Sequence, residues 1–60
     1  MHTRIRQLRK ALGLSQVVFA RRINRSPGYI SRVETNQVHI TDGVITDICS
    51  AFGVSEEWLR

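Results

Sequence analysis

The basic side chains are the residues of this sequence best suited to do chemistry, because they are concentrated in one part of the chain. Residues 1–33 contain eight cations and no acid. These cations are Arg4, Arg6, Arg9, Lys10, Arg21, Arg22, Arg25 and Arg32. Residues 34–60 contain five acids and one arginine, so the two parts carry formal charges of +8 and −4. A basic segment of this kind predicts binding to nucleic-acid phosphates; the competing interpretation is a charged face that only solvent contacts.

Other kinds of chemistry find little support in the sequence. His2 and His39 are far apart, and Cys49 has no partner at a zinc-binding spacing. No glycine-rich phosphate loop follows a strand, and no nucleophile, base and acid form a known pattern. The sequence therefore predicts a protein that is not an enzyme and that uses no metal, no cofactor and no small-molecule ligand.

The stretch over residues 14–34 has the pattern of two short helices joined by a tight turn. Ser15 is a suitable N-cap for a helix over about residues 16–23. Three apolar residues at helical spacing give this helix a buried stripe: Phe19, Ala20 and Ile23. Asn24 stands where the chain must turn, and asparagine tolerates a positive φ better than most residues.

A second helix is predicted over about residues 27–35. Ser26 is its N-cap, and Pro27 takes the first helical position, where the missing N–H costs no hydrogen bond. Ile30 and Val33 point inward. Two short helices with a tight turn between them are the DNA-reading helix-turn-helix unit. Residues after this helix, up to position 40, lack a helical period and predict a loop.

One helix is predicted before this unit, from Thr3 to Leu12. Thr3 is its expected N-cap, and Gly13 ends it. Three residues make its apolar stripe: Ile5, Leu8 and Leu12. Leu14 then enters the core.

Two helices are predicted after it. Thr41 caps the first of these, which ends at Gly53, and Ser55 caps the second. The apolar stripe of the first contains Ile45, Ile48, Cys49 and Phe52. Two residues of the second are expected to fold back onto the core: Trp58 and Leu59.

Sixty residues are enough for one small domain, so residues 1–60 are predicted to form a single all-α unit of five helices. No stretch approaches the roughly 20 apolar residues of a membrane span, and the first residues lack the apolar run of a signal peptide. A single cysteine excludes an internal disulfide. Because the sequence ends inside the last predicted helix, we expect that helix to be truncated and the natural protein to continue.

These patterns resemble the phage-repressor-like (Xre/Cro, lambda repressor-like) family of helix-turn-helix regulators. The first matching motif is Leu14-Ser15-Gln16, then Phe19-Ala20, Ile23, Ser26, Tyr29-Ile30-Ser31 and Val33-Glu34; the second is Ala51-Phe52-Gly53-Val54-Ser55-Glu56-Glu57-Trp58-Leu59. The resemblance covers nearly the whole chain. It implies a compact five-helix DNA-binding domain of a cytoplasmic, nucleoid-associated regulator from a bacterium or prophage. Such a protein occupies an operator in double-stranded DNA, usually to repress transcription, and a homodimer is expected because one small module contacts too few base pairs.

The expected phosphate contacts lie at the ends of the two central helices. The resemblance assigns Gln16 to a phosphate, which the free N–H groups of the helix start would also attract. Arg25 in the turn, and Asn36 with Gln37 just past the third helix, are the other expected phosphate contacts. Arginines on helix surfaces are usually only solvated, so the role of three others stays open: Arg4, Arg21 and Arg22.

Base reading is expected from the N-terminal part of the third helix. Here the sequence departs from the family, because Pro27 and Gly28 stand where a glutamine or arginine reader is often found. The residues expected to read or approach bases are Ser26, Gly28, Tyr29, Ser31 and Arg32. Arg32 can bind a guanine with two hydrogen bonds, and Tyr29 can contact a phosphate or a thymine methyl. The alternative is that Pro27 and Gly28 only shape the helix start and that discrimination between sequences is weak.

A structural ion pair is also implied by the resemblance. The family often joins an arginine of the first helix to a glutamate that ends the third, and Arg9 and Glu34 match these positions. Such a pair would orient the reading helix. At most one of Val17 and Val18 can reach the core, and Trp58 anchors either the core or a dimer face.

Two other functions remain open at this point. One is the antitoxin of a toxin–antitoxin pair that also binds its own promoter. The other is a protein-interaction module that kept the fold and lost DNA binding, for which Pro27, Gly28 and Val18 are the arguments.

Overall fold

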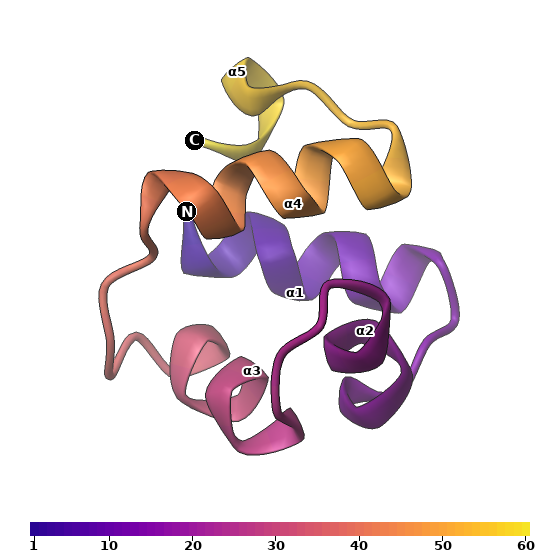
Figure 1. The fold of residues 1–60 in the computed structure, drawn as a ribbon, viewed down its shortest axis with the longest axis vertical. Helices are drawn as coiled ribbons and strands as arrows, with labels where there is room; N and C mark the ends of the chain where they lie inside the picture. Colours follow the sequence, from indigo (N-terminus) through magenta and orange to yellow (C-terminus); the bar gives the residue numbers. More distant parts are fainter.

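The computed structural model describes all 60 residues as five helices without a strand (Figure 1). The helices are α1 (His2–Ala11), α2 (Gln16–Arg22), α3 (Pro27–Glu34), α4 (Asp42–Phe52) and α5 (Glu56–Leu59). The predicted all-α fold is confirmed, with the helix-turn-helix in α2 and α3. None of the five helices has the length and apolar composition that a membrane crossing requires.

The helices form two pairs that α1 connects. α2 packs against α3, and α4 packs against α5, while α1 contacts both α3 and α5. Figure 1 shows the α4–α5 pair at the top of the view and the α2–α3 pair at the bottom, with α1 between them. The molecule measures 24 × 23 × 19 Å, so every helix lies close to the common core.

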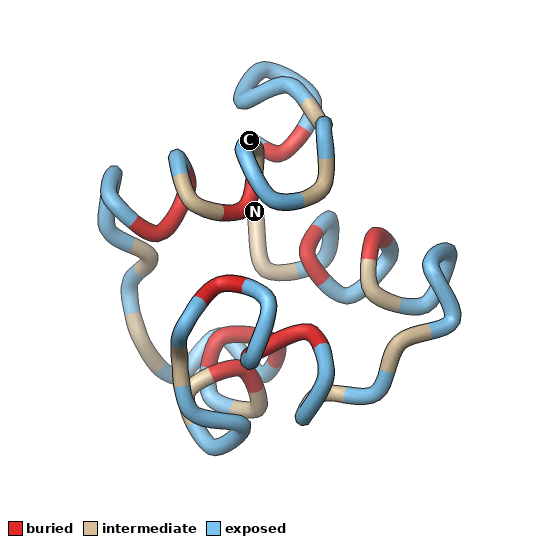
Figure 2. Tube along the Cα trace, turned by 45° about the vertical axis from the view of Figure 1, so that its right-hand side comes forward, coloured by how far each residue is buried: buried red, intermediate tan, exposed pale blue.

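That core contains eleven buried apolar residues, and every helix contributes to it (Figure 2). They are Ile5, Leu8, Phe19, Ala20, Ile23, Ile30, Val33, Val44, Ile45, Ile48 and Leu59. Phe52 adds its ring at the edge, stacked on Phe19 with the ring centroids 4.6 Å apart. This contact ties α2 to α4, so the helix-turn-helix is held by the C-terminal half of the chain as well as by α1.

Hydroxyl side chains cap four of the helices as predicted. Each accepts a hydrogen bond from the backbone N–H three residues later, at 3.0–3.3 Å. The capping residues are Ser15, Ser26, Thr41 and Ser55. The positive φ expected at Asn24 is also present, at 62°. Local sequence signals therefore predicted the starts of α2 to α5 and the central turn correctly.

The prediction that Thr3 caps the first helix is wrong. α1 begins at His2, with Met1 as its N-cap residue and no side-chain cap. The Met1 carbonyl accepts the N–H of Ile5 at 3.2 Å, and the Met1 side chain packs against the core. The packing of Met1 therefore moves the helix start to His2, before Thr3, and Thr3 lies within the first turn.

The prediction that Leu12 belongs to the buried stripe of α1 is also wrong, because this side chain is 46% exposed. Leu12 follows the last helical residue, and the chain turns away at Gly13, where φ is +69°. Leu14, beyond the turn, packs against the core instead.

Trp58 does not fold into the core as predicted and stays 38% exposed, whereas Leu59 is fully buried. Neighbouring residues of a helix point about 100° apart, and in α5 Leu59 points into the core while Trp58 lies at its edge. There the Arg4 guanidinium lies over the indole ring, 5.1 Å from its centroid. Val17 and Val18 are both exposed as well, which agrees with the expectation that at most one of them is buried.

Candidate nucleic-acid interface

The buried side of α3 leaves a well-defined outer face on this helix. Ile30 and Val33 are buried in the core, while Gly28 and Arg32 are exposed and Ser31 is half-buried. Tyr29 is half-buried and packs against the core, which leaves only part of its ring for a ligand. The outer face of α3 is thus formed by Gly28, Ser31 and Arg32, with the edge of Tyr29.

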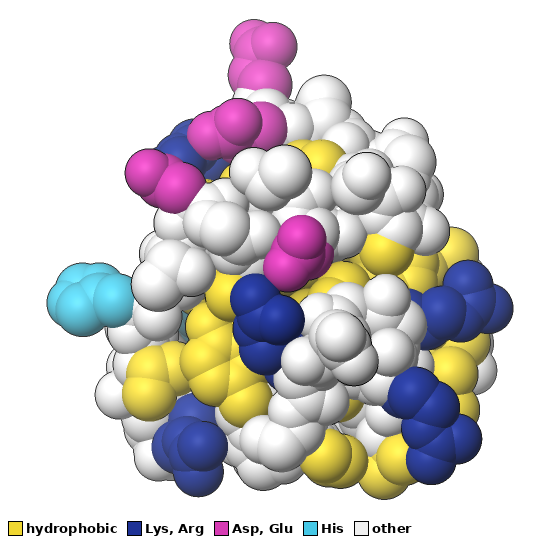
Figure 3. Space-filling model, viewed as in Figure 1, with side chains coloured by type: hydrophobic (Ala, Val, Ile, Leu, Met, Phe, Trp, Pro, Cys, Tyr) yellow, Lys and Arg dark blue, Asp and Glu magenta, His cyan; other side chains and the backbone are white.

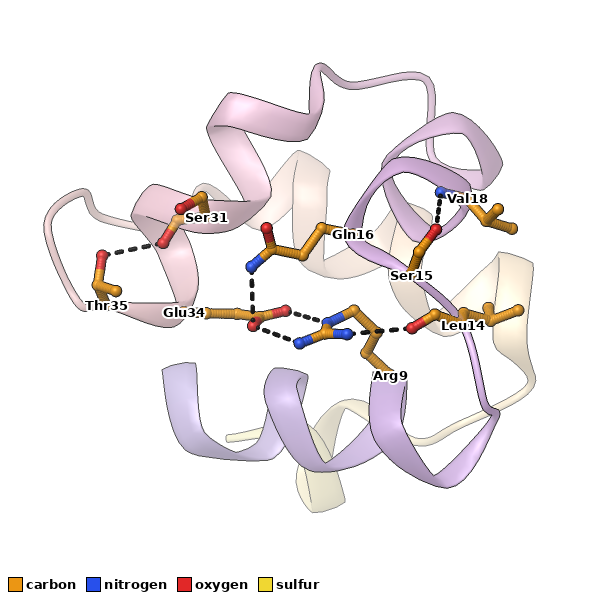
Figure 4. A network of polar contacts seen from close by, with 8 residues as sticks. All are labelled: Arg9, Leu14, Ser15, Gln16, Val18, Ser31, Glu34 and Thr35. Atoms are coloured by element: carbon orange, nitrogen blue, oxygen red, sulfur yellow. Dashed lines mark hydrogen bonds and ion pairs between the residues drawn. The ribbon is translucent and has the colours of Figure 1, made fainter.

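A largely buried ion pair connects α3 to α1 (Figure 4). Arg9 donates from Nε to Glu34 Oε2 at 2.6 Å and from a terminal nitrogen to Oε1 at 2.9 Å. Its other terminal nitrogen donates to the Leu14 carbonyl at 3.0 Å. Glu34 is the one charged residue in the buried set, at 7% exposure. The structure therefore brings together the two residues that the family resemblance paired, and it adds a bond to the segment before α2.

The environment of Glu34 keeps its carboxyl ionised. Burial by itself raises the pKa of Glu34, but hydrogen bonds from Arg9 and Gln16 and the charges of Arg9 and Arg6 outweigh it. The pKa of Glu34 therefore lies below its ordinary value of 4.5. The bond to Glu34 likewise raises the pKa of Arg9 against the effect of burial.

Gln16, an expected phosphate contact, joins the same network. Its amide nitrogen donates to Glu34 Oε1 at 3.3 Å (Figure 4). Because an ionised carboxylate only accepts hydrogen bonds, this contact fixes which way the amide is turned. The amide nitrogen carries a second hydrogen, which remains free for another acceptor. Gln16, the first residue of α2, is thus bonded to the ion pair and keeps one amide hydrogen for a further hydrogen bond.

Arg25, another expected phosphate contact, is engaged within the chain. Its guanidinium donates to the Asp47 carboxylate at 3.1 Å and to the carbonyls of Ile23 and Asn24 at 3.1 and 3.3 Å. Both members of the ion pair are partly exposed, and a surface hollow of about 410 Å³ lies beside them. In this arrangement Arg25 fastens the turn between α2 and α3 to α4.

Asn36 and Gln37, the remaining expected phosphate contacts, lie just beyond α3, and both are exposed. Asn36 has a positive φ of 59°, and the Gln37 N–H donates to the Arg32 carbonyl at 2.8 Å. These backbone features end α3. Ser26, at the other end of α3, uses its hydroxyl oxygen as the helix cap.

The charges of the sequence are segregated in space as well (Figure 3). Acidic side chains gather at the top of this view, over α4 and α5, whereas most basic side chains lie in the lower half. Six cations of the first three helices take part in no ion pair. They are Arg4, Arg6, Lys10, Arg21, Arg22 and Arg32. No group of three or more acidic, histidine or cysteine side chains is arranged to hold a metal.

Comparison with known proteins decides the family. A helix-turn-helix family model matches residues 5–59. The chain belongs to the Xre/lambda repressor-like helix-turn-helix family. This family consists of DNA-binding transcription regulators, so the chain is a DNA-binding domain of that class.

A curated relative of this helix-turn-helix domain is the propionyl-CoA carboxylase regulator of Cereibacter sphaeroides. The two are 37% identical over 51 residues, which is 85% of this chain but 11% of that protein. The chain thus spans about a tenth of the length of this relative. No solved structure matches the chain significantly.

The sequence analysis of this helix-turn-helix domain did not predict the acidic partner of Arg25. Asp47 lies 22 residues after Arg25 and on a different helix, and no local spacing relates the two. Because residues 1–33 contain no acid, the sequence suggested that Arg25 was free to bind a phosphate. In the fold, Asp47 from residues 34–60 pairs with it.

We expect Glu34→Ala to destabilise the domain by about 3–5 kcal/mol, because it leaves the largely buried Arg9 guanidinium without its counter-charge. Asp47→Ala is the matched control, since the partly exposed Arg25–Asp47 pair should contribute about 0–1 kcal/mol. Urea unfolding of both variants measures the difference. Equal stabilities would show that the Arg9–Glu34 pair does not hold α3 on α1.

The lowered pKa of Glu34 predicts a loss of stability in acid. A carboxyl with a depressed folded-state pKa stabilises the fold fully above its ordinary pKa of 4.5, and this contribution disappears as the pH falls through the lowered value. The difference in unfolding free energy between the wild type and Glu34→Gln should therefore be constant at about pH 7 and 5 and smaller at about pH 3. Asp47→Asn, measured in parallel, controls for general effects of acid. A difference that persists unchanged at the lowest pH would contradict this account.

Proposed function

We propose that this helix-turn-helix domain reads an operator in double-stranded DNA as a homodimer and represses transcription in a bacterial or prophage cell. The observation that carries the proposal is the combination of an exposed, uncommitted outer face on α3 with six cations of the first three helices that form no ion pair. In helix-turn-helix proteins the second helix of the unit enters the major groove. Phosphate contacts then fix its register, and base contacts supply the specificity.

The proposed phosphate contacts are Gln16, Asn36 and Gln37. Gln16 can donate its second amide hydrogen while the first stays on Glu34. A phosphate bound to Gln16 would therefore be held in a fixed position relative to α3. Asn36 and Gln37 directly follow α3, at the same C-terminal end where Gln16 bonds to Glu34. Contacts at this end would set how α3 lies in the groove. Arg25 would join them only by giving up its bond to Asp47.

The interaction-module alternative is favoured by one observation, the exposure of Val17 and Val18 at 46% and 38%. Single exposed apolar side chains are common on small domains, and the unpaired cations give the DNA proposal the stronger support. We place the domain in the bacterial cytoplasm, at the nucleoid, without a catalytic role.

Fluorescence anisotropy tests the proposal directly. The domain is titrated onto the DNA upstream of its own gene and onto a scrambled duplex of the same length, over a range of salt concentrations. We expect tighter binding to the upstream DNA and a logarithmic salt slope of about 0.9 per phosphate that a lysine or arginine contacts. Absence of binding to either duplex at low salt would favour the interaction module.

Gln16→Ala and Gln7→Ala form a matched pair in the same titrations. Gln7 is an exposed glutamine of α1, so its loss should leave the affinity for both duplexes unchanged. Loss of Gln16 should weaken binding to both duplexes about equally. Because the amide is uncharged and releases no counterion, the salt slope should stay the same.

The dimer is tested by size-exclusion chromatography with light scattering, with and without a palindromic duplex. Two domains on successive half-sites one helical turn apart are expected, since recognition by one module covers too few base pairs for genomic specificity. A protein that stays monomeric and binds the duplex only one to one would rule out dimeric recognition.

A further inference from the structure

Arg32 lies over an empty position on the outer face of α3. A Cβ atom built at Gly28 would come within 3.8 Å of one terminal nitrogen of the Arg32 guanidinium, and within 4 Å it would meet no other side chain beyond its chain neighbours. The guanidinium takes part in none of the ion pairs of the chain. It also donates none of the side-chain hydrogen bonds of the chain, so its donors are free.

The direction of the Arg32 side chain follows from helix geometry. Residues four apart share a face of a helix, and side chains lean toward its N-terminus. Arg32 therefore reaches back over the turn that begins at Gly28, and the missing side chain at Gly28 leaves that turn open. The guanidinium is displaced toward the N-terminal end of α3, which is the end nearest the bases in helix-turn-helix complexes.

The other side chains of this end of α3 have less to offer a base. Pro27 has no polar group. The Ser26 hydroxyl already accepts the Tyr29 N–H as a helix cap, and the Tyr29 ring is partly committed to the core. Ser31 is short and half-buried. Arg32 is the long, exposed hydrogen-bonding side chain of this face.

We propose that Arg32 is the dominant base reader of this domain and that Gly28 positions it by leaving the preceding turn open. This inference rests on the proposed DNA-binding function. An arginine binds the O6 and N7 atoms of guanine with two hydrogen bonds, the commonest specific contact in the major groove. The operator half-site therefore contains one strongly required G·C pair, and the positions next to it, which Pro27 and Gly28 face, are weakly specified.

The test is selection of bound duplexes from a pool with a randomised segment, using the 60-residue chain at low salt, followed by sequencing and by anisotropy on the selected site. We expect one guanine to dominate the selected site, and its replacement to weaken binding about tenfold to a hundredfold, as for a bidentate contact. Arg32→Ala should abolish this preference, and Arg32→Gln should move it toward adenine, the base that glutamine pairs with in the major groove.

Two substitutions at Gly28 separate its positioning role from a purely structural one. Gly28→Ala is the control, since 3.8 Å is an ordinary contact distance and Arg32 can stay in place, so the guanine preference should remain. Gly28→Leu fills the open turn without adding a hydrogen-bonding group. It should reduce the guanine preference to less than about threefold, while the salt slope, which counts phosphate contacts, stays the same.

The outcomes distinguish this inference from the proposed function. If the folded wild-type chain binds no duplex at low salt, both are wrong. If it binds DNA but selects no guanine, or if Arg32→Ala keeps the wild-type preference, the inference about Arg32 is wrong and the DNA-binding function stands. If Gly28→Leu selects guanine as strongly as Gly28→Ala, Gly28 has no positioning role. Circular dichroism of each variant ensures that the comparison is made between folded proteins.

Discussion

The buried ion pair between Arg9 and Glu34 is the interaction on which the rest of the structure depends. It joins α1 to the last residue of α3, and through the Leu14 carbonyl it also holds the segment that leads into α2. Three parts of the chain therefore meet at one guanidinium. In a domain of 60 residues, which buries only about 60% of its unfolded surface, few other contacts can define a helix direction so tightly. The angle of α3 is set by α1 as well as by its turn with α2.

A buried charge pair is rarely needed for stability alone, because apolar residues of similar volume often stabilise a core equally well. What the pair adds here is orientation. Glu34 offers only acceptors, so the guanidinium must approach in the carboxylate plane and the Gln16 amide must present its nitrogen. An apolar replacement could keep α1 and α3 packed, but it would leave the Gln16 side chain free to rotate. The network therefore couples the position of α3 to that of a side chain at the start of α2.

Much of the fold was predictable from the sequence because its signals act over a few residues. The caps at Ser15 and Ser26 and the positive φ at Asn24 depend only on their immediate neighbours. The errors concern residues whose surroundings come from distant parts of the chain, such as Leu12 and Trp58. The pairing of Arg25 with Asp47 was missed for the same reason, because Asp47 lies on a distant helix. The Arg9–Glu34 pair spans 25 residues, and only the family resemblance, not any local pattern, could indicate it. The roles of individual residues toward DNA remain predictions.

The distribution of ion pairs explains why a net charge of +4 understates the basic character of the helix-turn-helix. Asp42 and Glu56 are both paired with Arg60. Only Glu34 and Asp47 pair with cations of residues 1–33, and each of these pairs connects two parts of the fold. The other cations of this segment are left without an acidic partner. Concentrated like charges repel and cost a small fold some stability, and a polyanion relieves that cost when it binds. The same segregation that weakens the isolated domain therefore favours its complex with nucleic acid.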